Sequence, residues 1–267
     1  MIALNGVGLV RRTREEFSDD FKSRVLALLA GRLQRARRKT VLENVDLRIE
    51  PGVKVALIGP NGAGKSTILK VICGVLTPTT GTVEVRGRVA PLLELGAGFN
   101  PELSVVDNIT LYGVLLGLDR HTIDARREAI LAFAELDEYR QYPVRALSSG
   151  MAARLGFAIA TDADADILLV DEALSVGDES FRAKSRARID ALWHEHRTVV
   201  IVSHDLALVR AICEKAVWVE RGRIIAVGPP GEIVDRYVRS VDAAAIDALL
   251  RSRQSAPAEP SRSGLGS

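Results

Sequence analysis

A glycine-rich segment restricts more than any other feature what this chain can fold into. It occupies residues 59–67, reads Gly-Pro-Asn-Gly-Ala-Gly-Lys-Ser-Thr, and satisfies the phosphate-binding pattern G-x-x-x-x-G-K-[ST]. The apolar run 54–58 before it predicts a strand, and the apolar residues from Ile68 to Ile72 predict a helix that ends at Gly74. In such a context the loop N–H groups and the helix N-terminus face the same anion. The sequence therefore predicts a phosphate-binding loop at the edge of a β-sheet.

Every residue of this loop is expected to contribute to ATP binding: Gly59, Pro60, Asn61, Gly62, Ala63, Gly64, Lys65, Ser66 and Thr67. Lys65 should reach the β- and γ-phosphates, and the Ser66 hydroxyl should ligate Mg²⁺. The alternative interpretation is a tight structural turn. Because all four pattern positions are occupied and the flanking runs fit, the nucleotide site is favoured.

Two acids and a histidine follow the next buried strands. The apolar run Ile167–Val170 leads into Asp171 and Glu172. We expect Asp171 to hold Mg²⁺ through water, and Glu172, which points differently, to polarise the attacking water as a general base. His204 follows the apolar run Thr198–Val202 and is expected to hydrogen-bond the γ-phosphate, although a lone histidine is more often structural.

Strands alternate with helices along the chain, which predicts a mostly parallel sheet covered on both faces. Besides the strands already named, we expect strands at 2–10, 44–50, 82–85, 88–93, 216–220 and 223–227. The pattern is helical over 104–142, and a last helix is expected to begin near Glu232.

Other features of the sequence bear on where the chain works. Cys73 and Cys213 form no paired motif, which favours a reducing cytoplasm. Residues 1–10 do not resemble a signal peptide, and no apolar run reaches the roughly 18–20 residues that cross a bilayer. Any action at a membrane is therefore expected to require docking onto another protein.

A basic segment lies near the N-terminus. Residues 11–39 hold ten Lys or Arg against four acids, a local charge of +6 in a chain of net charge +2. Apolar residues at helical spacing from Phe17 to Leu33 predict an amphipathic helix at about 17–38. Its basic face could meet an anionic membrane surface, and a solvated helix face is an equal alternative. The small overall charge does not indicate a nucleic-acid partner.

The segment Leu147-Ser148-Ser149-Gly150-Met151, which precedes a helical run, resembles the signature motif of the ABC ATPases. A serine hydroxyl and a glycine backbone at a helix N-terminus suit an anion. The resemblance, which covers about residues 2–238, implies that Ser148, Ser149 and Gly150 bind the γ-phosphate of an ATP held by the other subunit of a homodimer. It also places 175–178 at the dimer interface and His204 at the family's switch histidine.

Within this family the chain resembles the ATPase subunits of bacterial exporters of O-antigen, capsule, teichoic acid or galactan, the Wzt-type subunits. Four segments carry the likeness: the signature with its continuation Ala-Ala-Arg-Leu-Gly-Phe-Ala, the stretch 87–103, the stretch 171–181 and the basic helix inserted after the first strand.

Two positions depart from the family pattern. The glutamine that touches Mg²⁺ in most members is replaced, at Leu95 or, with a shift of one residue, at Glu94, and we assign its role to Glu94. A carboxylate can ligate Mg²⁺ but cannot donate a hydrogen bond as an amide does. The aromatic ring that stacks on adenine is also missing. Arg11 could stack on the base, Phe17 could fold back onto it, or the stack could be lost.

The resemblance implies an α/β fold of the P-loop NTPase, ABC ATPase type, with a mostly parallel central sheet, an antiparallel β subdomain and a helical subdomain at about 100–160. The ATPase domain is expected at 1–238. A C-terminal extension, 239–267, is expected to be mostly disordered, because its last residues are rich in Ser, Pro and Gly. The carbohydrate-binding domain of some members is expected to be absent.

The expected function is that of an ATP-hydrolysing motor that uses ATP and Mg²⁺ to move a lipid-linked polysaccharide. The resemblance implies two copies of an integral-membrane permease as partners, and a peripheral location on the cytoplasmic face of the bacterial cytoplasmic membrane. The alternative is another ABC transporter, a nutrient importer or a drug or lipid exporter, although an importer would be expected to keep the glutamine and the aromatic ring.

A DNA-repair ATPase needs a long coiled coil between Lys65 and Ser148, and the 83-residue separation leaves no room for one. A translation-type protein would carry two cassettes.

Overall fold

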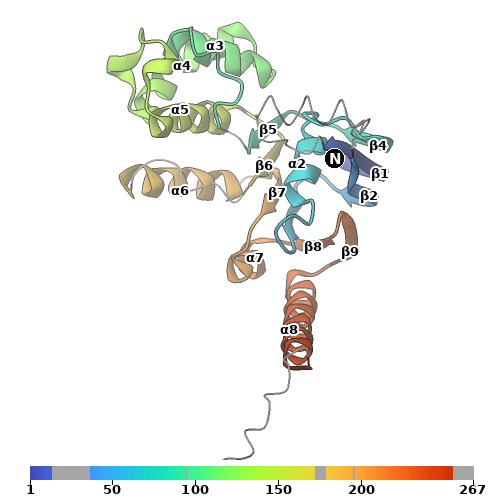
Figure 1. Ribbon diagram of the computed structural model, residues 1–267. Helices are drawn as coiled ribbons and strands as arrows, with labels where there is room; N and C mark the ends of the chain where they lie inside the picture. Colours follow the sequence, from blue (N-terminus) through green and yellow to red (C-terminus); the bar gives the residue numbers. More distant parts are fainter. Residues whose placement is uncertain (14–36, 94, 172–178, 195, 255–267) are drawn as a thin grey trace, which may run out of the picture.

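The computed structural model describes residues 1–13, 37–93, 95–171, 179–194 and 196–254 of the chain. Two β-sheets and a group of helices make up these parts (Figure 1). Among the described residues, no helix combines the length and the apolar character needed to cross a membrane.

A six-stranded sheet forms the centre of the molecule, with strand order β5-β6-β7-β3-β8-β9. Its first five strands are parallel and β9 is antiparallel to β8. Strands β6 and β7 are buried at every residue, as expected of parallel strands covered on both faces. The bounds are β3 Lys54–Ile58, β5 Val89–Leu92, β6 Ile167–Val170, β7 Thr198–Val202, β8 Lys215–Glu220 and β9 Arg223–Gly228.

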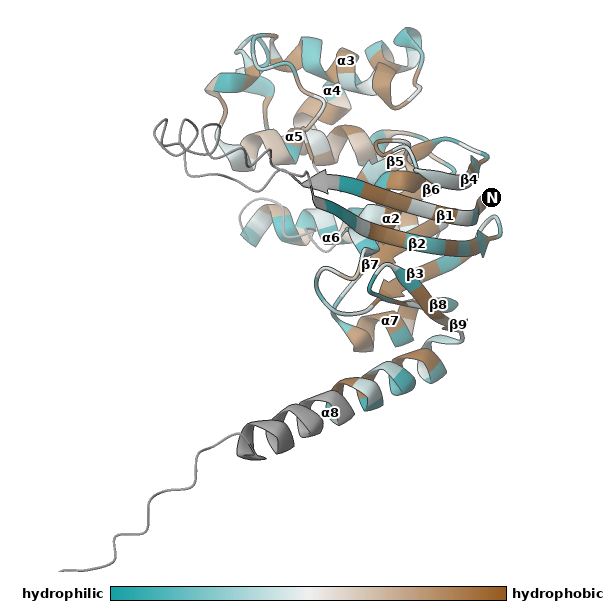
Figure 2. Ribbon diagram, turned by 45° about the vertical axis from the view of Figure 1, so that its right-hand side comes forward, coloured by the Kyte–Doolittle hydropathy of each residue, from teal (hydrophilic) through white to brown (hydrophobic). Residues whose placement is uncertain are grey.

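A three-stranded antiparallel sheet, of order β2-β1-β4, lies beside it. Its strands are β1 Ile2–Thr13, β2 Arg37–Ile49 and β4 Thr80–Val85. Helix α2, Lys65–Ile72, packs between the two sheets, where its Ile68 and Leu69 share one buried apolar cluster with Ile2, Ile49 and Leu57. The brown stretches of the β1, β2 and β3 ribbons in Figure 2 mark the hydrophobic residues of these strands. The loop before α2 is thereby held between both sheets.

A group of helices lies on the side of the central sheet that β5 and β6 form (Figure 1). They are α3 Val105–Leu115, α4 Arg120–Ala134, α5 Ser149–Asp162 and the short turns η1 Asp137–Tyr139 and η2 Val144–Ala146. Helices α6 Glu179–His194 and α7 Leu206–Ile212 follow β6 and β7, and α8, Pro230–Gln254, leaves the body of the molecule. The predicted fold class, an α/β fold with a mostly parallel sheet, an antiparallel sheet and a group of helices, is confirmed.

The structure differs from the sequence prediction mainly at the ends of elements. Strands β1 and β2 run further than expected, because Val10 to Thr13 pair with Arg37 to Thr40 across the hairpin. Most of the helix expected at 17–38 lies outside the described residues, but Arg37 and Arg38 belong to β2. The extension at 239–267 is not disordered throughout: α8 continues to Gln254, because its last turns are rich in the good helix formers Ala, Leu and Arg. Residues 255–267 lie outside the described part.

Asn108, on α3, holds the loop that joins the central sheet to the helices. Its side chain is fully buried. The amide nitrogen donates to the carbonyl oxygens of Asn100, Leu103 and Ser104 at 2.9, 3.0 and 3.0 Å, and the amide oxygen accepts from the Asn100 N–H at 2.8 Å. One side chain therefore fixes both ends of the turn at 100–104.

We expect Asn108→Leu to lower the free energy of unfolding by about 3 kcal/mol, because each buried backbone group left without its partner costs about 1–3 kcal/mol. Urea denaturation measures this loss. Asn100→Ala is the matched control: the Asn100 side chain accepts only from the Glu102 N–H at an exposed position, so its loss should cost under about 1 kcal/mol. Equal effects of the two changes would contradict the role given to Asn108.

Candidate functional site

The loop after β3 has a backbone that only glycine accommodates at its key positions. Gly59 has φ 143°, and a Cβ atom there would lie 2.0 Å from the carbonyl oxygen of Val219. Gly64, which precedes α2, has φ 106°, and its Cβ would lie 2.9 Å from a methyl group of Leu42. These dihedrals lie in the region that L side chains rarely adopt. The glycines of the phosphate-binding pattern are therefore required by the shape of the loop.

Lys65 is the first residue of α2 and is only 6% exposed. Its ammonium group lies within the curve of the loop, where it donates to the carbonyl oxygens of Gly59 and Pro60 at 2.7 and 2.9 Å. A buried cation at a helix N-terminus adds to the positive end of the helix dipole. The loop therefore concentrates positive charge where phosphates of a nucleotide would lie.

Strand order brings the remaining predicted residues to this loop. β6, β7 and β3 are neighbours and parallel, so the residues after their C-terminal ends meet at one edge of the sheet. Asp171 follows β6, His204 follows β7, and both line a cavity of about 630 Å³ with residues 61–67 of the loop. A second cavity, of about 740 Å³, lies at the opposite edge of the sheet and contains none of the predicted residues.

The oxygen donors in the first cavity fit Mg²⁺. The Ser66 hydroxyl and the Asp171 carboxylate both line it, and hard oxygen ligands are those that Mg²⁺ prefers. Among the described residues no group of three or more His, Cys, Asp or Glu side chains forms a metal cluster. Mg²⁺ is usually bound through one or two protein oxygens together with substrate phosphates.

Sequence reasoning missed part of the cavity wall. Lys39, Thr40 and Val41 of β2 and the turn Arg221-Gly222 between β8 and β9 also line the cavity. The turn rests on the loop itself: the Gly222 N–H donates to the Ala63 carbonyl at 2.8 Å. Arg221 has a left-handed φ of 49°, and the glycine after it is the signal of a tight turn in the sequence. The sequence does not show, however, that this turn contacts a loop some 160 residues earlier in the chain.

The structure describes only some of the residues that were predicted to replace the family's adenine-stacking ring and its glutamine. Arg11 is exposed at the end of β1 and lines the cavity. No aromatic side chain stands among the cavity residues of the described chain. Glu94, Phe17 and Glu172 lie outside the described residues. Leu95 packs against the hydrophobic core, so it does not act as a ligand.

The predicted signature residues lie on a different surface. Ser148 caps α5 and its hydroxyl accepts from the Met151 N–H at 3.2 Å. Ser148 and Ser149 are exposed, Gly150 is partly exposed, and none of the three lines the cavity. The start of α5 is thus an open helix N-terminus, suited to an anion, but it does not complete the cavity of its own chain.

Comparisons with known proteins agree with this geometry. Residues 42–175 match the ABC transporter family. The O-antigen export system ATP-binding protein RfbB of Klebsiella pneumoniae is 42% identical over 79% of this chain and 86% of its own length. The protein of that name from Myxococcus xanthus is 43% identical over 88% of this chain, which spans 54% of that relative. The teichoic acids export ATP-binding protein TagH of Levilactobacillus brevis is 39% identical over 73% of this chain and 54% of its own length.

Solved structures show the same fold. A dimeric ATP-binding cassette in a post-hydrolysis state, bound to ADP and Pi, superposes with a TM-score of 0.64 over 86% of this chain and 99% of the cassette, at 23% identity. The fold, the family match and the relatives lead to one assignment. The chain belongs to the ABC transporter family, and its fold is that of an ATP-binding cassette.

Proposed function

We propose that this chain is the ATP-hydrolysing motor subunit of an exporter that moves a lipid-linked polysaccharide across the cytoplasmic membrane. The observation that carries the proposal is the presence, in one chain, of a phosphate-binding cavity with Lys65, Ser66, Asp171 and His204 and of an exposed helix start at Ser148. The three relatives described above, which are 39–43% identical to this chain, are named for O-antigen and teichoic acid export. That shared naming supports the substrate class.

In the proposed cycle the loop at 59–67 and Lys65 hold the phosphates of ATP. Mg²⁺ bound at Ser66 and Asp171 would neutralise charge that develops on those phosphates. Glu172 would accept a proton from the attacking water, and His204 would orient the γ-phosphate. Ser148 to Gly150 of a second copy would close the site, so that ATP binding joins two subunits. Arg11 would contact the base, and Glu94 would take the place of the family's glutamine.

We further propose that the homodimer docks beneath two permease subunits on the cytoplasmic face of the membrane. Another ABC transporter, such as a nutrient importer, is the second candidate. The absence of the family's adenine-stacking aromatic side chain and of its glutamine favours the exporter. Purification of the permease with the tagged chain, and mass analysis of the lipids of a deletion strain, test the assignment. We expect a lipid-linked glycan to accumulate, and loss of nutrient uptake without glycan accumulation would favour the importer.

We expect Glu172→Gln to trap a dimer with ATP bound, because glutamine keeps the size of the side chain but cannot act as a general base. The rate of ATP hydrolysis should fall about 10²–10⁴-fold, and size-exclusion chromatography in ATP should show a lasting dimer. Glu179→Gln, an exposed change at the start of α6, is the control and should hydrolyse ATP normally. Normal turnover by Glu172→Gln would refute its role as the base.

A further inference from the structure

A carboxylate at the end of α4 joins three helices. The Glu135 carboxylate forms one ion pair with the guanidinium of Arg154 on α5, at 3.0 Å, and another with the ammonium group of Lys184 on α6, at 3.3 Å. The two cations also face aromatic rings: Arg154 lies 4.9 Å from the ring centroid of Phe181 on α6, and Lys184 lies 4.8 Å from that of Phe133 on α4. Charges and rings thus connect α4, α5 and α6 at one place.

The backbone of Glu135 is in a conformation that a glutamate rarely adopts. The residue caps the C-terminal end of α4 with φ 59° and ψ 44°, in the left-handed region, where glycine is the usual residue. Its side chain is 47% exposed, and that of Arg154 is 16% exposed. The ion pairs of Glu135 therefore have to offset the roughly 1–2 kcal/mol that a left-handed backbone costs a residue with a side chain. Strained residues of this kind are typical of functional positions.

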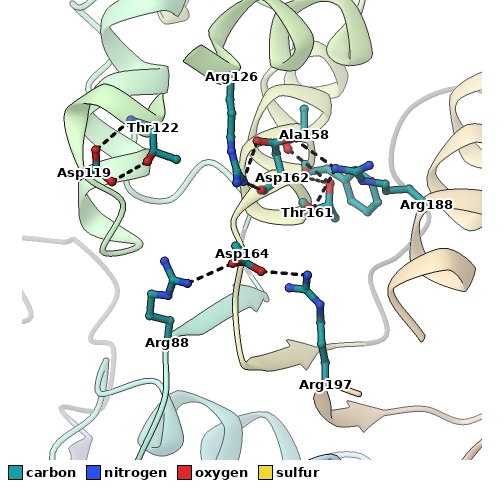
Figure 3. A network of polar contacts seen from close by, with 11 residues as sticks. Arg88, Asp119, Thr122, Arg126, Ala158, Thr161, Asp162, Asp164, Arg188 and Arg197 are labelled. Carbon is teal, nitrogen blue, oxygen red and sulfur yellow. Dashed lines mark hydrogen bonds and ion pairs between the residues drawn. The ribbon is translucent and has the colours of Figure 1, made fainter. Parts of the chain in front are cut away.

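The far end of α5 is fixed separately, as Figure 3 shows. Asp162 pairs with Arg126 of α4 at 3.5 Å and with Arg188 of α6 at 3.4 Å. The same two arginines donate to the carbonyl oxygens of Asp162 and Thr161 at the C-terminal end of α5, where cations are favourable. The C-terminal end of α5 is therefore a fixed point of this helix.

The Glu135 contact with Arg154 lies between this fixed end of α5 and the start of the helix. At about 1.5 Å per residue, Arg154 is roughly 12 Å from the fixed end and Ser149 roughly 20 Å from it. A lateral shift at Arg154 would be enlarged by more than half at the start of the helix. Displacements of about 1 Å at a reacting group can cost about 10²-fold in rate.

We infer that Glu135 is a positioning residue for ATP hydrolysis. By holding Arg154 and Lys184 together, it sets where α5 presents Ser148 to Gly150 to the nucleotide of the second copy. The inference rests on the proposed function, because the start of α5 acts on a nucleotide only in a dimer.

The test compares the full-length chain with Glu135→Gln and Glu135→Gly. Both variants remove the carboxylate, and the glycine variant also relieves the left-handed backbone. We expect kcat for ATP hydrolysis to fall about tenfold in both, with KM and the affinity for a fluorescent ATP analogue within about twofold of wild type, because the cavity of each chain is untouched. The melting temperature of Glu135→Gly should equal or exceed that of Glu135→Gln. Glu135→Asp, which keeps the charge, should recover part of kcat.

Glu128→Gln is the matched control. Glu128 is also on α4, but it pairs with Arg140 at 2.5 Å inside the same group of helices, so its loss should leave kcat unchanged. A wild-type kcat in Glu135→Gly, or a rise in KM equal to the fall in kcat, overturns the inference. If the wild-type chain itself does not hydrolyse ATP, the proposed function fails and the inference fails with it; the two failures are therefore distinguishable.

Discussion

Lys65→Met should lower kcat/KM for ATP by about 10²–10³-fold, the usual effect of removing one group that stabilises developing charge in a buried site. The ammonium group of Lys65 lies inside the phosphate-binding loop with 6% of the residue exposed. Little water can reach that place to substitute for the lost charge. Steady-state hydrolysis and equilibrium binding of ATP measure the effect, and binding should weaken together with turnover.

The fold should tolerate this change. Methionine has nearly the length of lysine, but it cannot donate to the carbonyl oxygens of Gly59 and Pro60, and a buried backbone group left without its partner costs about 1–3 kcal/mol. The melting temperature should therefore fall by about 4–8 °C, and the chain should stay folded at the assay temperature. Lys70→Met, in the last turn of the same helix and outside the cavity, is the control and should keep full activity. A Lys65→Met chain that binds ATP as tightly as wild type would contradict the phosphate site.

The elements around this lysine were the most predictable part of the chain. Strands β6 and β7 occur at the predicted bounds, Ile167–Val170 and Thr198–Val202. Each is a short apolar run bounded by polar residues, and a strand that is apolar at every position is expected in the centre of a sheet that is covered on both faces. Because the C-terminal ends of neighbouring parallel strands share one edge, the sequence also predicted that Asp171 and His204 would lie near the loop, as the structure has them.

Features that depend on distant contacts could not be predicted in the same way. The turn at Arg221 and Gly222 lines the cavity because β8 is hydrogen-bonded beside β3, and nothing local to the turn indicates that neighbour. Glu135 has an ordinary helical sequence around it, and its left-handed backbone and its two cations, 19 and 49 residues away, appear only in the folded chain. Both cases concern tertiary contacts, which periodicity and motifs do not encode.

The proposed sharing of one ATP site between two copies can be tested by mixing two inactive variants. Gly150→Asp is suited to this purpose, because a Cβ at Gly150 would meet nothing closer than 3.9 Å. An acid in the first turn of α5 is also favourable for the helix, so the variant should fold. Its new charge should nevertheless repel the γ-phosphate of the partner's ATP, and turnover should fall about 10²-fold or more.

An equal mixture of Gly150→Asp and Lys65→Met should regain up to about a quarter of the wild-type rate, because random pairing makes half of the dimers mixed and each mixed dimer has one intact site of two. Within such a dimer, the unaltered loop of the Gly150→Asp chain meets the unaltered helix start of the Lys65→Met chain. Hydrolysis assayed before and after mixing measures the gain, and each variant alone at the same total concentration is the control. A site completed within one chain would leave the mixture at the mean of the two low rates. That result would be at odds with the exposed position of Ser148 and Ser149, outside the cavity of their own chain.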